Sequence, residues 1–126
     1  MKLAAFLGLA GALGILFGLE FLLIPELALS QYGVPTEAHN QMQARYFGST
    51  LLAFGLLLWL ARGTQDATAQ RALLIASVAL NLFGLLLSLW SRFAGLQSLL
   101  AWLSVSIYGA LSFGALYFLL RPGQRG

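Results

Sequence analysis

The sequence has little charge and no cysteine, and both shortages limit what the protein can be. Only 9% of its 126 residues are charged, against about 25% in a typical soluble domain. A soluble helical bundle needs a polar face on every helix, which seven basic and four acidic residues cannot supply. The absence of cysteine excludes disulfides, thiolate metal sites and redox thiols. The single histidine, His39, excludes a haem held by two histidines of one chain.

Motifs that mark common enzyme and nucleotide sites are missing as well. The sequence contains no P-loop, no dinucleotide-binding glycine pattern, no HExxH and no Ser-His-Asp arrangement. Its net charge of +3 comes from isolated basic residues at the ends of apolar runs. That placement is typical of membrane topology signals and not of nucleic-acid binding. We therefore expect a protein that is not an enzyme and that has no cofactor, no metal and no nucleic-acid partner.

Long apolar runs are what the sequence has in abundance, since 60% of its residues are hydrophobic. Each run is long enough to cross a hydrocarbon core of about 30 Å as a helix that rises about 1.5 Å per residue. The four runs are Leu3–Ile24, Ala44–Ala61, Ala69–Trp90 and Leu96–Leu120. They predict an all-α fold: an integral membrane bundle of four transmembrane helices, one domain over residues 1–126, in a lipid bilayer.

The first run also has some features of a signal peptide. Lys2 precedes it, and the small residues Ala28 and Ser30 follow it. The run is longer than the hydrophobic region of about 7–15 residues that such peptides contain. We therefore expect it to be retained as the first span.

Basic residues near the ends of the runs predict the orientation of the chain. Five of them lie on the side that holds both termini, and two lie on the opposite side. Because the connections are short, this excess predicts that both termini are cytoplasmic. The five are Lys2, Arg62, Arg71, Arg121 and Arg125, and the two are Arg45 and Arg92.

The longest connection, residues 25–43, lies on the predicted outer side and should be interfacial. Pro25 is typical of a helix start, so a short helix is expected there, ended by Gly33. A second helix start is predicted with Thr36 as the N-cap and Glu37 in the first turn, where an acidic side chain is favourable.

Small residues predict how the helices pack. In lipid, helices associate through small residues that let their backbones approach. On the first run, Ala4, Gly8, Gly11 and Gly18 fall on one helical face, and Gly14 and Gly18 form a GxxxG pair. We interpret this stripe as packing within the chain, with a homodimer seam as the alternative. The predicted packing glycines are Gly8, Gly11, Gly14, Gly18, Gly48, Gly55 and Gly84.

Polar residues form similar stripes on the last two runs. The third run carries Ser77, Asn81 and Ser88 with Gly84 between them, and the fourth carries Ser104, Tyr108 and Ser112. Each spacing keeps its residues on one side of a helix. We expect these faces to point into the bundle, with leucine facing the lipid.

Four polar residues form the candidate site, because such groups are costly inside a bilayer. Glu20 lies about one turn inside the outer end of the first run, and Arg45 and Arg92 lie at the same level. Asn81 lies near the middle of the third run. Several interpretations remain open: an ion pair between Glu20 and Arg45, an anion or amphiphile held by the arginines, a proton-coupled role for Glu20, and an oligomer contact or lipid headgroup site. On a helix, however, Glu20 points away from Gly11 and its stripe.

One short motif resembles a known family. The segment Ala44-Arg45-Tyr46-Phe47-Gly48-Ser49 is similar to the start of the second span in the DoxX-like group of small bacterial four-span membrane proteins. There, an arginine, an aromatic residue and one or two glycines open that span. Pro25-Glu26 and Tyr32-Gly33 resemble the group's first outer loop, so the likeness covers about the first half of the chain.

This resemblance implies a four-helix bundle in a bacterial inner membrane, and it gives Arg45 added weight. It also implies an accessory role, since some relatives are linked to membrane redox complexes. We accordingly expect a small non-enzymatic membrane protein that acts by association, as a homo-oligomer or as an accessory subunit of a larger membrane complex. The alternative is a binder or transporter of a small amphipathic or anionic molecule, such as a lipid, at the outer side of the membrane.

Overall fold

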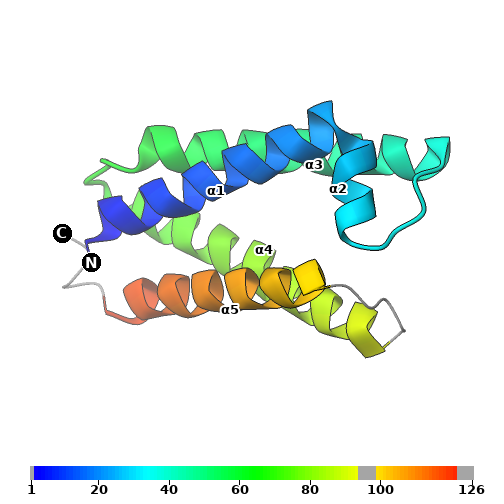
Figure 1. Cartoon of the computed structure of the whole chain (residues 1–126). Helices are drawn as coiled ribbons and strands as arrows, with labels where there is room; N and C mark the ends of the chain where they lie inside the picture. Colours follow the sequence, from blue (N-terminus) through cyan, green and yellow to red (C-terminus); the bar gives the residue numbers. More distant parts are fainter. Residues whose placement is uncertain (1, 94–98, 122–126) are drawn as a thin grey trace.

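The computed structural model describes residues 2–93 and 99–121, with the side chains of residues 91–93 and 99–101 excepted. Within these ranges the chain is helical and lacks strands, and four of its helices are long and apolar enough to cross a membrane. The prediction of an all-α bundle with four candidate spans is therefore confirmed. The helices are α1 (Leu3–Leu23), α2 (Pro25–Gln31), α3 (Ala38–Ala61), α4 (Ala67–Phe93) and α5 (Leu99–Leu120) (Figure 1).

The connection between α1 and α3 contains the short helix that the sequence predicts. α2 begins with Pro25 in its first turn. Its end is followed by Gly33, which has a φ of 73°. This left-handed conformation favours glycine, because a side chain would meet the backbone there. The chain can therefore turn sharply at this point and run back towards α3.

The prediction of Thr36 as the N-cap of the next helix is wrong. α3 begins at Ala38, and Glu37 occupies the N-cap position without a capping hydrogen bond from its side chain. The side chain of Gln41 instead donates from Nε2 to the Thr36 carbonyl oxygen at 2.6 Å. This bond satisfies the backbone before the helix, so the chain stays extended through residue 37 and the helix starts one residue later.

α1 and α3 pack through direct contact of their backbones. A Cβ atom built on Gly18 would lie 2.6 Å from the Leu52 nitrogen, and one built on Gly48 would lie 2.6 Å from the Leu22 nitrogen. A Cβ on Gly11 would lie 2.8 Å from the Gly55 carbonyl oxygen. These separations are too short for any side chain. Because α3 covers the glycine stripe of α1, that stripe is not free to form a homodimer seam.

α4 and α5 form the second antiparallel pair. The aromatic ring of Tyr108 lies directly on Gly84, where any Cβ atom would overlap the ring. At the start of α4, Asp66 accepts a hydrogen bond at 3.2 Å from the Ala69 backbone nitrogen to its Oδ2 atom. This cap makes α4 begin at Ala67, ahead of the predicted apolar run.

The two pairs meet near the end of the bundle that holds the N-terminus. Phe6 of α1 packs on Phe118 of α5, with 5.4 Å between ring centroids. Gly114 leaves room for the Phe6 ring, which a Cβ atom there would overlap. Away from this contact the pairs diverge, and α2 lies beside the wider end (Figure 1). The buried core around the contact consists of Leu3, Phe6, Leu7, Ala10, Leu58, Leu73, Leu74, Ala115 and Phe118.

The close backbone contact makes a quantitative prediction. Replacing Gly18 with alanine forces α1 away from α3, because the new methyl group would sit 2.6 Å from the Leu52 nitrogen. Overpacking of this kind costs about 1–3 kcal/mol. We expect Gly18→Ala to lower the thermal unfolding temperature of the purified protein.

Gly109→Ala is the matched control. It also adds one methyl group to a helix, but nothing lies within 4 Å of that position. Higher helix propensity should leave its stability equal or raised by about 0.5–1 kcal/mol. If both variants unfold at the same temperature, the α1–α3 contact is not as close as described.

Candidate functional site

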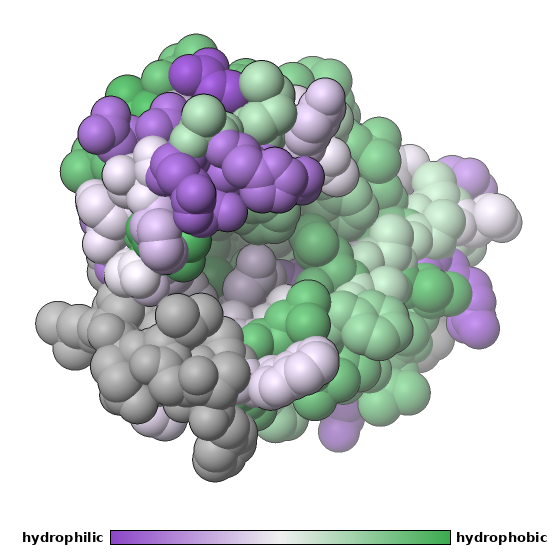
Figure 2. Space-filling model, turned by 90° about the vertical axis from the view of Figure 1, so that its right-hand side faces the viewer, coloured by the Kyte–Doolittle hydropathy of each residue, from purple (hydrophilic) through white to green (hydrophobic). Residues whose placement is uncertain are grey.

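A cavity of about 330 Å³ lies between the two helix pairs. α1 and α3 bound it on one side, and α4 and α5 bound it on the other. Leu29 of α2, with Tyr32 and Val34 from the turn that follows, lines it as well. Figure 2 views the molecule from the end at which α2 lies and shows a recess between the two helix pairs. The volume falls at the lower end of the range of about 300–1,000 Å³ that is typical of ligand sites.

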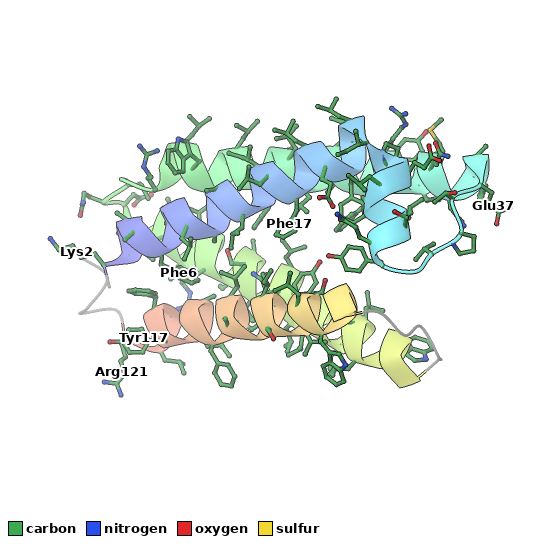
Figure 3. The ribbon with its side chains drawn as sticks, in the orientation of Figure 1. Lys2, Phe6, Phe17, Glu37, Tyr117 and Arg121 are labelled. Atoms are coloured by element: carbon green, nitrogen blue, oxygen red, sulfur yellow. The ribbon has the colours of Figure 1, made fainter. Side chains whose placement is uncertain are left out.

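The wall formed by α1 and α3 is apolar and rich in aromatic rings. Phe17 and Phe21 line it from α1, and Phe47 and Phe54 line it from α3. Phe17 points from α1 into the space between the pairs (Figure 3). The rings of Phe21 and Phe47 meet edge to face, with 5.0 Å between centroids. Such contacts hold the rings in fixed positions, so this wall offers a shaped hydrocarbon surface.

The wall formed by α4 and α5 carries the polar atoms. Asn81 is only 4% exposed, and its Nδ2 atom donates to the Ser77 carbonyl oxygen at 2.8 Å. Because a carbonyl oxygen can only accept, the bonded side-chain atom must be the nitrogen. The Oδ1 atom is left without a hydrogen bond to any residue in the described ranges. The hydroxyl of Tyr108 likewise has no partner there, and both residues line the cavity.

A hydroxyl pair connects the two halves beside the cavity. Ser104 Oγ of α5 lies 2.9 Å from the hydroxyl oxygen of Tyr32. The Tyr32 ring in turn stacks on Phe21, with 5.9 Å between centroids. Tyr32 therefore links α1 to α5 across the diverging end of the bundle. Both residues are neutral, so this link tolerates a low-dielectric setting.

The structure does not bring together the three predicted site residues whose side chains it describes. Asn81 lines the cavity. Glu20 is half-buried on α1 and is not among the lining residues. Arg45 is exposed and donates from its terminal nitrogen to the Leu22 carbonyl oxygen at 3.2 Å. The side chain of Arg92 lies outside the described residues.

Arg45 and Glu20 form no ion pair in the part of the chain that the structure describes. The hydrogen bond of Arg45 ends at the last turn of α1, where a cation offsets the partial negative charge of the carbonyl end. Arg45 also borders a second, more open depression, together with Glu26 and Thr36. The angular position of each residue around its helix axis explains the separation, because residues at one depth in the membrane can still point in different directions.

Several lining residues were not predicted as site residues. Ser104 and Tyr108 had a usable signal, because their i, i+4 spacing places both on one face of α5. The phenylalanines of α1 and α3 had no such signal in the sequence. A phenylalanine in an apolar run fits the pattern equally well whether it faces lipid or a cavity. Tyr32 is visible in the sequence only as the residue before a turn glycine.

Comparison of the chain with models of protein families, with curated proteins and with solved structures gave no match. The resemblance to the DoxX-like group stays a prediction. Among the described residues, acidic and histidine side chains form no cluster that could hold a metal ion. The chemical content of the cavity is thus hydrocarbon, aromatic rings, hydroxyls and one amide.

Proposed function

We propose that this protein is a small, non-enzymatic membrane protein that binds a small amphipathic molecule in the cavity between its helix pairs. The observation that carries the proposal is the cavity of about 330 Å³ with one apolar wall and one polar wall. Four candidate spans support its placement in a lipid bilayer. An occupant that is apolar on one side and polar on the other matches both walls.

The alternatives for filling this space are weaker. A dry void leaves the lining atoms without contacts, which protein interiors largely avoid. Water needs two to four polar partners, and the wall of Phe17, Phe21, Phe47 and Phe54 supplies none. Lipid hydrocarbon alone would leave the Asn81 oxygen and the Tyr108 hydroxyl without partners. An amphipathic molecule satisfies both walls at once.

Binding can be tested with a substitution that places a larger side chain in the cavity. Ile107 lines it from α5, and an indole at this position takes up space that the occupant needs. We expect Ile107→Trp to weaken binding about tenfold or more, because overpacking costs about 1–3 kcal/mol. The measurement is the amount of small amphiphile that copurifies with the protein, determined by native mass spectrometry.

Phe113→Trp is the control for this experiment. Phe113 lies further along α5, does not line the cavity and is 76% exposed, so its indole should point away from the bundle. This variant should copurify with as much amphiphile as the original chain. Equal loss in both variants, or no bound molecule in the original chain, would contradict the proposal.

Association is a second candidate function, either as a homo-oligomer or as an accessory subunit of a larger membrane complex. A specific feature of α5 favours it: Ser106 and Ala110 are exposed, and nothing lies within 4 Å of a Cβ built on Gly109. Small residues at i, i+4 spacing let another helix approach closely in lipid. The glycine stripe of α1 gives association no support, because α3 already covers it.

A bulky residue on this face should prevent association. We expect Ala110→Trp to reduce the crosslinked dimer in bilayers at least about fivefold, since closely packed small-residue faces tolerate no indole. Ala79→Trp, at an exposed alanine of α4, should leave the dimer yield unchanged. A wild-type chain that never crosslinks to itself or to a second protein would rule out this function.

We also propose that the end holding Lys2 and Arg121 faces the cytoplasm, in a bacterial inner membrane. Lys2 and Arg121 lie at one end of the bundle and Glu37 lies at the other (Figure 3). Arg62 follows the end of α3, on the same side as Lys2. The excess of basic residues on that side supports the orientation, and the DoxX-like motif supports the choice of membrane.

The lack of native cysteine makes this orientation directly testable. Glu37→Cys and Gln65→Cys each place a single thiol at an exposed position. In intact cells, a maleimide that cannot cross the membrane should label the first variant several-fold more than the second. After lysis, both should react equally. The reverse pattern in intact cells would place the termini outside.

A further inference from the structure

The unpaired polar atoms of the cavity indicate what kind of head group it can hold. The Oδ1 atom of Asn81 is an acceptor only, and its amide nitrogen is already engaged by the Ser77 carbonyl. A partner for Oδ1 must therefore carry a proton to donate. The hydroxyl of Tyr108 can donate or accept. Asn81 and Tyr108 are neighbours, since the Tyr108 ring rests on Gly84, less than one helical turn after Asn81.

The charge of the lining sets a second condition. The side chains that line the cavity are uncharged in the part of the chain that the structure describes. Arg45, the described arginine nearest in depth, is turned to the end of α1 and does not line it. A carboxylate or phosphate placed beside Asn81 would find no cation among the described lining residues, and burying it unpaired is strongly unfavourable. The described lining therefore favours a neutral head group.

The shape of the site sets a third condition. The apolar wall is built from α1 and α3 and faces the polar atoms of α4 and α5 across a volume of about 330 Å³. A single hydrocarbon chain can lie along Phe17 and Phe54 while its head reaches Asn81. A lipid with two chains and a bulky head exceeds a space at the small end of known ligand sites.

We infer that the cavity binds a neutral, hydroxyl-bearing amphiphile with one hydrocarbon chain, taken up from the bilayer. The ligand hydroxyl donates to Asn81 Oδ1 and accepts from the Tyr108 hydroxyl, and its chain lies against the phenylalanine wall. This inference rests on the proposed binding function and specifies its ligand class. It separates alcohols from fatty acids, esters and phospholipids of similar chain length.

Probes with one chain and different heads test the inference. Photoactivatable forms of 1-dodecanol, methyl dodecanoate and dodecanoate, with the same diazirine near the end of the chain, are added at neutral pH to the full-length protein in phosphatidylcholine nanodiscs. Labelled residues are mapped by peptide mass spectrometry. We expect the alcohol to label the cavity wall of α1 and α3 with an apparent affinity about threefold to tenfold above that of the ester, as expected for one or two neutral hydrogen bonds. The carboxylate should label it least.

Two variants identify the atoms responsible. Tyr108→Phe keeps the ring that covers Gly84 and removes only the hydroxyl, and Asn81→Leu removes the acceptor. Each should lower labelling by the alcohol, and Asn81→Leu should bring it towards the level of the ester. Asn81→Leu should leave ester labelling unchanged, because an ester has no proton to donate to Oδ1, whereas Tyr108→Phe removes a donor that the ester carbonyl can also use. Tyr117→Phe, on the same helix but outside the cavity lining, should keep the full preference.

The outcomes distinguish the two levels of the proposal. If the ester or the carboxylate labels the cavity as strongly as the alcohol, the inferred ligand class is wrong while the binding function stands. The same holds if the preference for the alcohol persists in both Tyr108→Phe and Asn81→Leu. If none of the probes labels cavity residues above the lipid-facing surface, the binding function itself fails, and the ligand class fails with it.

Discussion

Backbone contact between α1 and α3 is the constraint from which the rest of the arrangement follows. Inside a bilayer, two leucine-covered helices gain little from meeting, because lipid chains are as apolar as leucine. Stable association needs close van der Waals contact, and glycines at 11, 18, 48 and 55 supply it by letting the two backbones approach. The contact determines which face of α1 and which face of α3 are buried against each other. It leaves the phenylalanines of both helices on the side that faces α4 and α5.

The cavity is a consequence of how the second pair meets the first. α4 and α5 pack against the first pair at one end through Phe6, Phe118 and their leucine neighbours. At the other end the pairs separate, and the hydroxyls of Tyr32 and Ser104 bridge the gap at 2.9 Å. A tight core at one end and a polar bridge at the other enclose a space lined by both pairs. The described lining of this space consists of uncharged side chains.

Much of the fold could be predicted from the sequence, because it depends on patterns that repeat along the chain. Run lengths predict the four spans, Pro25 and Gly33 predict the short helix between the first two, and glycine spacing predicts the packing face of α1. Of the predicted site residues, Asn81 lines the cavity because a polar residue in the middle of a span has to face inward.

Other features could not be predicted from the sequence. The position of a residue along an apolar run indicates its depth in the membrane, but it does not show which neighbouring helix the side chain faces. Glu20 and Arg45 lie at one level, yet Arg45 turns to the Leu22 carbonyl. Thr36 is a residue type common at the N-cap, but in the structure its carbonyl accepts from the Gln41 side chain and Glu37 occupies the N-cap position. Nothing in an apolar run marks Phe17 or Phe54 as facing a cavity and not lipid. These choices depend on contacts between segments far apart in the sequence.

The two walls of the cavity belong to separate helical hairpins, and this division has a consequence for how selectivity can change. The aromatic wall comes from residues before position 60, and the unpaired amide and hydroxyl come from residues after position 80. Under the proposed binding function, substitutions in the first half of the chain would alter the length or width of hydrocarbon accepted while keeping the head-group chemistry. Substitutions in the second half would alter the head group accepted while keeping the fit of the chain. Such a protein could acquire a new ligand in two independent steps, each of which leaves the other half of the site intact.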